Sequence, residues 1–478
     1  MTPDAAAVPR DVVVVGGGPA GLSAALAAAG AGCRVLLVDG AQQLGGQYYR
    51  HLPTAMSAAA PGRLHHDFTP GQRLLAAVAG CPRIQVSTRT QVFAARLVGG
   101  RPELHLTFAG GGTEVVRPGC VVLATGAYDR SLPFPGWDLP GVMTPGAAQA
   151  LLKGQYVLAG RRVLVGGTGP FLLSVAAGLV EAGAVVVGVL EASSPRQWAG
   201  HLRAVLPNAT KLAEGASYLR VLRRHGVPLH FRSAVTAATG EGQVVAATVS
   251  RLDSAWRKRP GSDRVVACDA VAVGWGFTPN VELAVALGTA TRVVPADGSV
   301  VVVTDRYART SVPSVLAAGE VAGVAGSAVA VAEGTLAGLA AAERTGHIQA
   351  AEMRHRGRRA AARRERQRRF GAALLDVYPV HPGWTSWLDD DTVVCRCEEV
   401  TRGDVRQGVA ELGATDLRSL KLLTRVGMGP CQGRVCGHAV SGLLRQETGR
   451  DVPDVDAFAK RPFAAPVSLG ELARHAAE

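Results

Sequence analysis

Short apolar runs alternate with glycine-rich turns and helical stretches in the first part of the chain. Residues 12–15 are four valines, residues 16–21 form a glycine-rich turn, and residues 22–30 are rich in alanine. A second apolar run follows at 35–39. Continuous apolar runs of this length, bounded by turns, are typical of strands buried in a parallel sheet. The pattern predicts a strand, a turn, a helix and a second strand.

The same pattern recurs about 150 residues later, over 162–191. A strand is predicted at 163–165, followed by a glycine turn, an apolar helical stretch and a strand that ends at Glu191. Two such βαβ units predict an α/β fold with two dinucleotide-binding, Rossmann-like domains. Three further apolar runs lie at 121–123, 271–273 and 315–317, and a helical stretch lies at 327–343.

The order of these elements predicts that the second domain is inserted in the first. The first domain is expected over 1–128 and 270–345, and the second over 129–269. After them we expect an arginine-rich, helical linker over 346–391, a small cysteine-containing domain over 392–450 and a C-terminal tail over 451–478. One helix is expected in the tail from Leu469.

Composition and charge narrow the function classes. The chain is 47% hydrophobic but only 5% aromatic and has 59 glycines, which suits close α/β layers. Of the net charge of +13, +7 comes from residues 351–370, which hold nine arginines and two glutamates. Because the rest of the chain is nearly balanced, nucleic-acid binding is not expected. The basic segment is expected to be either a solvated helix face or a surface for an acidic partner subunit.

Targeting and membrane signals are not evident in the sequence. The N-terminus has no basic stretch followed by a long apolar run, and no stretch of about 18 uninterrupted apolar residues occurs. We therefore expect a cytoplasmic protein without a transmembrane segment. In that reducing compartment, structural disulfides are not expected.

The first glycine turn has the spacing of a dinucleotide-binding loop. Gly16 permits the tight turn, Gly18 lets the backbone approach a pyrophosphate, and Gly21 lets the helix pack on the strand. The phosphates are then expected at the helix N-terminus beside Pro19 and Ala20, where unpaired N–H groups favour anions. The acid that ends the second strand is expected to bind the adenosine ribose; it is Asp39.

The glycine loop alone does not distinguish FAD from NAD, but two later segments resemble the two-dinucleotide-domain flavoproteins. These segments are Ala124-Thr125-Gly126 and Ala318-Gly319-Glu320. The resemblance implies FAD, with Glu320 near the flavin ribityl chain in place of the family's usual aspartate. Further cofactor contacts are expected from Gly46, Gln47, Thr125, Gly126 and Gly319. Because Leu44–Arg50 has no cysteine pair, dithiol exchange is not expected.

The second glycine turn departs from the motif at its third position, where Leu172 replaces glycine. Its phosphate contacts are expected from Gly167, Gly169 and Pro170. Glu191 is expected to bind ribose hydroxyls and to repel a 2′-phosphate, which favours NAD over NADP. Two alternatives stay open at this point: a vestigial site, or a bound adenine nucleotide that never donates hydride.

Four of the eight cysteines are grouped near the C-terminus, and the others stand alone beside strands. The group reads Cys395-x-Cys397 and Cys431-x4-Cys436. Four thiolates so close in sequence fit one metal site, and thiolates favour iron–sulfur clusters or zinc. The single-residue gap in the first pair is unusual for zinc. The surrounding glycines allow backbone N–H groups to point at sulfur, so a [2Fe–2S] cluster is favoured.

The cysteine segments resemble the bacterioferritin-associated-ferredoxin-like (BFD-like) [2Fe–2S] domain. Its union with the two nucleotide domains resembles the α (A) subunits of opine oxidases, proline and hydroxyproline dehydrogenases and hydrogen cyanide synthase. Residues 45–50, 126–130, 133–137 and 139–147 carry the likeness outside the cluster.

The resemblance implies an oxidoreductase that acts on CH–NH or CH–NH2 donors as part of a complex. A separate flavoprotein subunit would oxidise an amino or imino acid and pass electrons to this chain. Two other hypotheses stay open: a self-sufficient NADH-dependent reductase, and a non-catalytic electron-transfer scaffold. The sequence identifies no general base.

Overall fold

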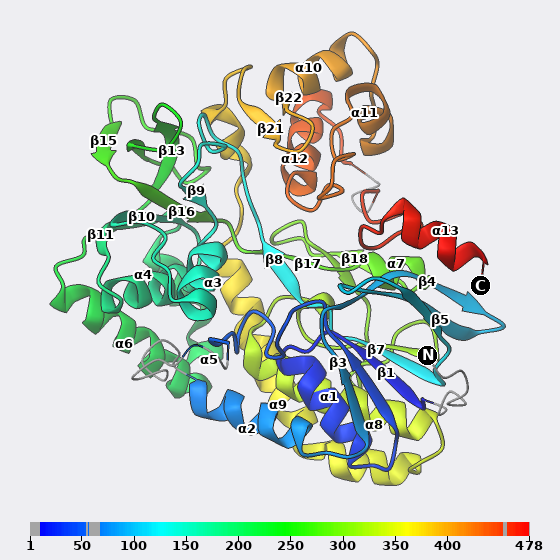
Figure 1. The fold of residues 1–478 in the computed structure, drawn as a ribbon. Helices are drawn as coiled ribbons and strands as arrows, with labels where there is room; N and C mark the ends of the chain where they lie inside the picture. The colour runs from blue at the N-terminus through cyan, green and yellow to red at the C-terminus, as the bar shows by residue number, and fades with distance from the viewer. Residues whose placement is uncertain (1–9, 54–55, 57–66, 453–456, 478) are drawn as a thin grey trace.

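The first domain is built on a five-stranded parallel sheet (Figure 1). The computed structural model describes residues 10–53, 56, 67–452 and 457–477; the predicted domain start at residue 1 and parts of the predicted tail lie outside them. Every residue of the central strand is buried, as the four-valine run predicts. The strands are, in spatial order, β20 (Val315–Ala317), β7 (Cys120–Leu123), β1 (Val12–Val15), β2 (Val35–Val38) and β3 (Ile84–Ser87).

Two helices cover one face of this sheet and pack against each other, α1 (Pro19–Ala29) and α8 (Ser327–Arg344). Their backbones approach closely because α8 presents glycine at the contact. A Cβ on Gly334 would lie 2.0 Å from the carbonyl oxygen of Ala20, and one on Gly338 would lie 2.2 Å from that of Ala24. The other face is covered by a three-stranded antiparallel sheet of β4 (Thr90–Val98), β5 (Arg101–Phe108) and β6 (Thr113–Val116), while α2 (Phe68–Ala79) packs beside α1.

The second domain repeats this plan. Its five-stranded sheet has β12 (Leu229–Phe231), β11 (Val185–Glu191), β10 (Arg162–Gly167), β16 (Ala270–Gly274) and β9 (Val142–Met143) in that order. The helices α3 (Pro145–Gln155), α4 (Phe171–Glu181) and α6 (Ala209–Arg224) pack on one face. The antiparallel strands β13 (Ser233–Thr239), β14 (Ala246–Arg251) and β15 (Arg264–Ala267) cover the other. The turns η2 (Pro195–His201) and η3 (Leu206–Asn208) flank α5 (Leu202–Val205).

One strand lies in a different domain from the one that the sequence predicts. Ala270–Gly274 was expected to open the second part of the first domain, but it pairs with β10 in the second sheet. A short apolar run does not show which of two parallel sheets it joins. The chain crosses between the domains on the antiparallel pair β8 (Ala127–Asp129) and β17 (Phe277–Pro279). The remaining short elements of the first domain are α7 (Glu282–Ala286), β18 (Thr291–Val293), β19 (Val300–Val302) and η4 (Glu320–Ala322).

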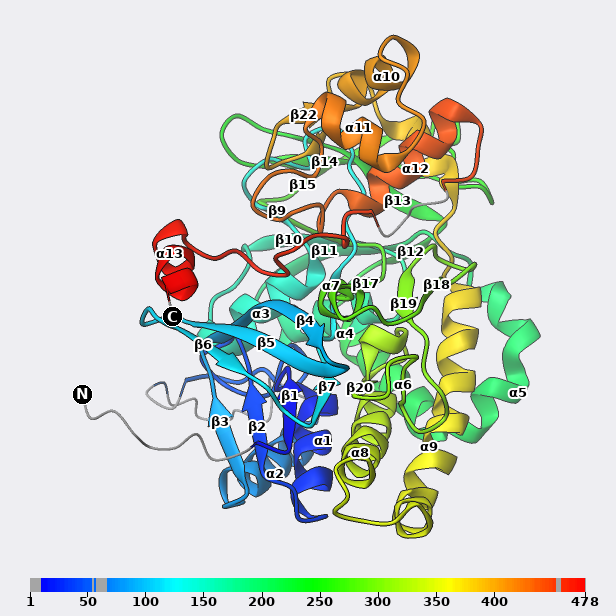
Figure 2. The same cartoon turned by 90° about the vertical axis from the view of Figure 1, so that its right-hand side faces the viewer.

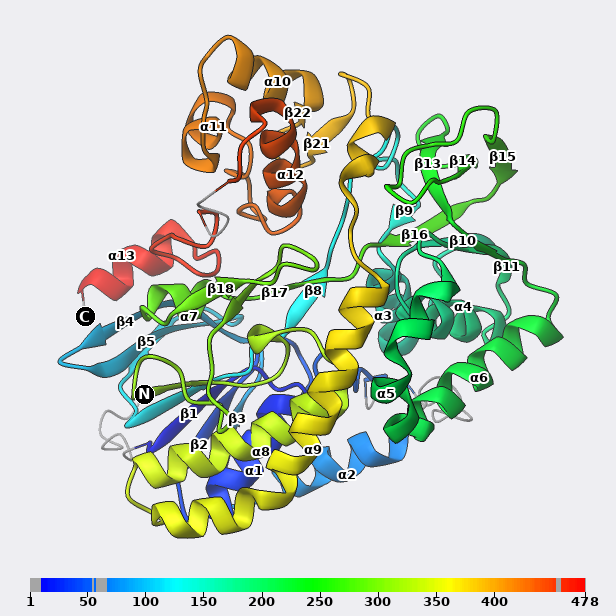
Figure 3. The same cartoon turned by 180° about the vertical axis from the view of Figure 1, so that it is seen from behind.

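The arginine-rich segment forms a helix of 28 residues, α9 (Ala350–Val377), which packs along α8 (Figure 3). Two of its arginines point inward to Glu333, which is 1% exposed. Arg364 and Arg368 each donate to its carboxylate at 2.8 Å, and the backbone N–H of Gly319 donates to it at 3.0 Å. The outer arginines are exposed. The helix is thus a packed element on the inner side and a solvated basic face on the outer side.

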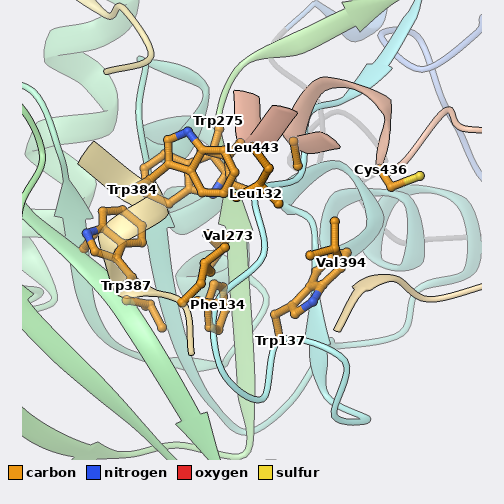
Figure 4. Close-up of a cluster of buried hydrophobic side chains, with 14 of the residues drawn as sticks. Leu132, Phe134, Trp137, Val273, Trp275, Trp384, Trp387, Val394, Cys436 and Leu443 are labelled. Carbon is orange, nitrogen blue, oxygen red and sulfur yellow. The ribbon is translucent and has the colours of Figure 1, made fainter. Parts of the chain in front are cut away.

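The cysteine-containing domain, residues 392–450, packs on the second domain through tryptophans (Figure 4). The Trp387 indole donates to the carbonyl of Trp256 at 2.8 Å, and the Trp137 indole donates to the carbonyl of Val393. One apolar cluster therefore runs from β13–β15 into the cysteine domain. The chain enters this domain from η5 (Pro382–Trp387). The elements of the domain are β21 (Val393–Cys395), β22 (Val400–Thr401), α10 (Arg402–Ala410), α11 (Leu417–Thr424) and α12 (Gly437–Thr448).

The C-terminal segment runs from the cysteine domain back to the first domain (Figure 2). Phe458 lies against the glycines of the cysteine loops, and the N–H of Ala464 donates to the carbonyl of Phe93 on β4. The segment ends in α13 (Leu469–Ala477), at the position where the sequence predicts a helix. The C-terminal segment therefore connects the cysteine domain to the first domain.

A search of the described ranges finds no helix with the length and apolar character needed to cross a membrane.

The Glu333 contacts give a stability prediction. Glu333→Ala leaves two arginines without their buried partner, so we expect it to lower the free energy of unfolding by about 3 kcal/mol or more. Glu365→Ala is the matched control, because Glu365 pairs with Arg369 at the exposed face of the same helix. It should cost no more than about 0.5 kcal/mol. Urea unfolding of both variants measures the difference, and equal losses would contradict the role given to Glu333.

Candidate functional site

A cavity of about 1710 Å³ lies between the two nucleotide domains and is lined by both glycine loops. Single small-molecule pockets usually measure about 300–1,000 Å³, so this volume suits more than one bound group. Its walls include α3, α6, the start of α8 and the C-terminal half of α9. The cavity thus opens onto every loop that the sequence assigned to nucleotide binding.

The glycines of the first loop lack a side chain for two different reasons, close packing and access to the cavity. A Cβ on Gly16, whose φ is +106°, would lie 2.3 Å from the carbonyl oxygen of Ala124, and one on Gly21 would lie 1.7 Å from that of Gly16. These two glycines are required by packing. A Cβ on Gly18 would meet no protein atom closer than the Cα of Gly46, at 3.8 Å. Gly18 faces the cavity, as expected of a position that a pyrophosphate approaches.

Asp39 directly follows β2 beside this loop and lines the cavity. Its carboxylate accepts hydrogen bonds from the backbone N–H groups of Gly17 at 2.5 Å and Ala41 at 2.7 Å. Burial raises its pKa, and these two N–H groups oppose the rise. The carboxylate thus fixes the glycine turn and also borders the space where a ribose would lie.

The later segments of the predicted flavin site meet at the same place. All six lie at the cavity wall: Gly46, Gln47, Thr125, Gly126, Gly319 and Glu320. Gly319 has a φ of +82° and a Cβ there would lie 3.0 Å from the Cβ of Ala20 on α1, so the segment sits directly on the first loop. The Glu320 carboxylate makes no hydrogen bond to any described residue, and burial raises its pKa to about 7. An unpaired acid at this wall fits a hydroxyl-bearing ligand.

The second glycine loop repeats the geometry of the first. A Cβ on Gly167 would lie 1.8 Å from the carbonyl oxygen of Gly274, whereas one on Gly169 would meet nothing within 4 Å. Pro170 precedes the first residue of α4 and lines the cavity with Gly169. Leu172, at the position of the third glycine, is buried in the core between α4 and the sheet. The substitution therefore leaves the phosphate side of the loop open.

The carboxylate of Glu191 accepts several hydrogen bonds from its own loop, which the sequence does not predict. It accepts hydrogen bonds from the Thr168 hydroxyl at 2.9 Å and from the backbone N–H groups of Gly169 at 2.9 Å and Ser193 at 2.8 Å. Burial raises its pKa to about 7, although these donors oppose the rise. The carboxylate therefore holds the turn, and its predicted role in choosing NAD over NADP stays a prediction.

Three aromatic residues that were not predicted from the sequence also form part of the cavity wall. The Trp198 ring lies 6.2 Å from the Phe370 ring and nearly parallel to it, and its indole donates to the Tyr378 hydroxyl at 3.2 Å. Phe370 and Tyr378 come from α9 and the residue after it, and all three residues line the cavity. No sequence motif marks them, because they come from separate segments.

The four grouped cysteines lie together in the cysteine domain. The thiol of Cys436 contacts those of Cys395 and Cys431, and the thiol of Cys431 also contacts that of Cys397. Hydrogen bonding from Cys436 lowers the pKa of Cys395 to about 6 and that of Cys431 to about 5, and backbone N–H groups add to the effect. The same hydrogen bonds raise the pKa of Cys436, and burial raises the pKa of Cys397. It is the gathering of four thiols in one place that suits this site to iron or zinc.

Glycines bring backbone donors close to these sulfurs. Gly427 has a φ of +78° and its N–H points at the Cys395 sulfur; Gly433 has a φ of +80° and its N–H points at the Cys431 sulfur. A Cβ on Gly429 would lie 2.2 Å from the Cβ of Cys397. Such N–H donors are a feature of iron–sulfur sites, where they help to set the potential.

A [2Fe–2S] cluster divides its four thiolates between two irons. The donor set and its N–H environment therefore fit the predicted cluster.

Two known protein families match separate parts of the chain. Residues 10–351 match the pyridine nucleotide-disulphide oxidoreductase family. The chain belongs to this family. Residues 393–446 match the BFD-like [2Fe-2S] binding domain. This member of the family is therefore an FAD-dependent oxidoreductase with a [2Fe–2S] domain, as predicted, and the zinc alternative is not supported.

Similar proteins are known over nearly the whole chain. The hydrogen cyanide synthase subunit HcnB of Pseudomonas aeruginosa is 35% identical, covering 96% of this chain and 98% of the relative. The A subunit of opine oxidase from Agrobacterium tumefaciens is 33% identical, covering 97% and 91%. The solved L-proline dehydrogenase from P. horikoshii shares the fold with a TM-score of 0.68 at 20% identity, covering 97% of this chain and 79% of that chain.

The Gly18 geometry gives a prediction for flavin binding. Gly18→Glu should fold, because the Cβ meets no protein atom closely, but it should not retain FAD, because the carboxylate fills the phosphate space and repels it. Gly110→Glu is the control, since Gly110 lies in an exposed turn with no neighbour within 4 Å. Flavin absorbance of the purified variants is the measurement. Full FAD occupancy in folded Gly18→Glu would refute the assignment.

A second prediction concerns the cluster. Cys431→Ser should lose iron and sulfide, because a hydroxyl is a poor substitute for thiolate on iron, and it should keep FAD, whose site has its own core. Cys81→Ser removes a free cysteine outside the group and should keep both cofactors. Iron, sulfide and flavin assays on anaerobically purified protein decide between these outcomes. A Cys431→Ser variant with full iron content would show that Cys431 is not a ligand.

Proposed function

We propose that this chain is the electron-transferring α subunit of a heteromeric dehydrogenase of amino or imino acids, of the opine, proline or hydroxyproline type. A separate flavoprotein subunit oxidises the substrate, and this chain receives the electrons and passes them through its [2Fe–2S] cluster. The complex works in the cytoplasm, where reducing conditions keep the cluster thiolates from forming disulfides.

One observation carries this proposal: the flavin cavity reaches the cluster domain. Arg434, which lies between Cys431 and Cys436, lines the same cavity as Gly18 and Asp39. A flavin and an iron–sulfur cluster placed beside each other suit the conversion between two-electron and one-electron transfer. The described cavity wall offers no cysteine pair for dithiol exchange. The relatives add support, since three are named as subunits: of hydrogen cyanide synthase, opine oxidase and sarcosine oxidase.

Each residue has a place in this proposal. Gly16, Gly18 and Gly21 with Pro19 and Ala20 form the FAD phosphate site, and Asp39 binds the ribose. The flavin end is completed by Gly46, Gln47, Thr125, Gly126, Gly319 and Glu320. A second adenine nucleotide would lie on Gly167, Gly169 and Pro170 beside Glu191. The cluster ligands are Cys395, Cys397, Cys431 and Cys436. When bound, FAD supplies the exchange of one or two electrons and the cluster supplies single-electron transfer.

A second candidate, a self-sufficient NADH-dependent reductase, is favoured by one feature. The second glycine loop opens into the cavity, and no protein atom fills the space beside Gly169. If NADH binds there and donates hydride, it alone should reduce the flavin of the isolated chain. NADPH should then be slower, because Glu191 lies where a 2′-phosphate would come. The first proposal needs neither reaction.

The test is co-expression of this chain with a candidate flavoprotein subunit, sought first among the neighbouring genes. The purified complex should reduce an artificial one-electron acceptor when an amino or imino acid is added, and the chain alone should not. Loss of the cluster through Cys431→Ser should abolish reduction of the acceptor by this chain while leaving dye reduction by the partner alone. Equal acceptor reduction without the partner, with NADH as sole donor, would favour the second candidate. A complex that reduces nothing with any amino or imino acid would contradict the proposal.

A further inference from the structure

A buried carboxylate joins the flavin domain to the cluster loop. Glu282, the first residue of α7, is 3% exposed. Its Oε1 atom accepts from Arg434 at 2.8 Å and from Arg461 at 2.7 Å. Arg434 lies on the loop between two cluster cysteines, and Arg461 lies on the C-terminal segment. Three parts of the chain that are distant in sequence therefore meet at one oxygen atom.

The backbone reinforces this junction. Arg434 also donates to the carbonyl of Ala464, and Arg461 donates to the carbonyl of Gln432. Phe458 lies against the loop glycines, because a Cβ on Gly427 would come within 2.3 Å of its ring and one on Gly433 within 2.7 Å. The cluster loop is thus held in position against the flavin domain by partners on both sides.

The junction lies at the flavin cavity. Among the described residues of the cysteine domain, Arg434 alone lines that cavity. Tyr128, from the crossing strand β8, lines it too. Burial raises the pKa of Tyr128, and Glu282, Arg434 and Cys431 all lie near enough to act on it electrostatically. Arg434 and Tyr128 therefore both border the cavity and lie close to the loop that carries Cys431.

We infer that Arg434 is a positioning residue for electron transfer between the flavin and the cluster, and that its charge favours the reduced cluster. This inference rests on the proposed function. Reduction adds one negative charge to the cluster, and a guanidinium that is only 20% exposed and lies 3.5 Å from the Cys431 carbonyl oxygen stabilises that charge. With FAD and the cluster bound, an electron passed from the reduced flavin to one iron would cross the part of the cavity wall that holds Arg434 and Tyr128. Glu282 fixes the guanidinium in place, and its negative charge partly offsets the positive charge of Arg434.

Four variants of the full chain test this inference: Arg434→Gln, Arg434→Lys, Glu282→Gln and Arg425→Gln. Arg425→Gln is the matched control, because Arg425 belongs to the same domain and pairs with Glu398 at 2.8 Å but is 68% exposed, so solvent screens its charge. Iron and flavin contents are measured first. The cluster potential then comes from a redox titration followed by electron paramagnetic resonance. The transfer rate comes from reducing the bound flavin with a light pulse, EDTA being the electron donor, and freezing samples to follow the reduced cluster.

We expect Arg434→Gln to shift the reduction equilibrium of the cluster about tenfold toward the oxidised form, or about 59 mV for one electron. Transfer should also slow by about tenfold or more. Arg434→Lys keeps the charge and should keep the potential, and Arg425→Gln should match the wild type. Glu282→Gln removes a negative charge and should move the potential upward. A purely structural role would not shift the potential in opposite directions in the two variants.

Several results would overturn the inference. Wild-type potential and rate in an Arg434→Gln protein that holds both cofactors would do so. If that variant loses its cluster, Glu282→Gln decides: an unchanged or lower potential would contradict the inference. A wild-type chain whose flavin never reduces the cluster would instead refute the proposed function itself. Failure of the role given to Arg434 and failure of the proposed function therefore give different results.

Discussion

Glu282 is a carboxylate with almost no access to water, and it accepts from two arginines that arrive from different parts of the chain. A buried charge of this kind is stable only with its partners in place, and breaking such a pair by removing one partner costs several kcal/mol. The cluster loop, the C-terminal segment and the flavin domain must therefore come together as one arrangement. The position of the cluster relative to the flavin cavity depends on it.

The same principle recurs at the other end of the cavity. Glu333, buried on α8, holds two arginines of α9 and the backbone of Gly319, so the flavin-side loop is fixed by a second carboxylate. α9 and the residue after it contribute aromatic residues to the cavity wall. Two of the arginines that contribute to the basic charge of the chain thus also form salt bridges with a buried carboxylate. The outer arginines of α9 are exposed to solvent.

The local elements near the glycine loops could be predicted closely, because strand, turn and helix there follow from contiguous residues. The strand at 12–15, both glycine turns and the grouped cysteines lie where the sequence places them. Strand 270–274 was assigned to the wrong sheet, because an apolar run does not reveal its pairing partners. Glu282, Arg434 and Arg461 were missed for a related reason. A salt bridge between residues 179 positions apart leaves no periodic signal.

Electron transfer through this chain requires FAD and a two-iron cluster in the same polypeptide. Quantification of flavin, iron, acid-labile sulfide and zinc in anaerobically purified protein measures both directly. We expect one FAD, about two irons and about two sulfides per chain, from the stoichiometry of a [2Fe–2S] cluster on four thiolates. Protein that contains zinc and no sulfide would contradict this expectation, because the four cysteines would then hold a structural metal and no electron could pass beyond the flavin.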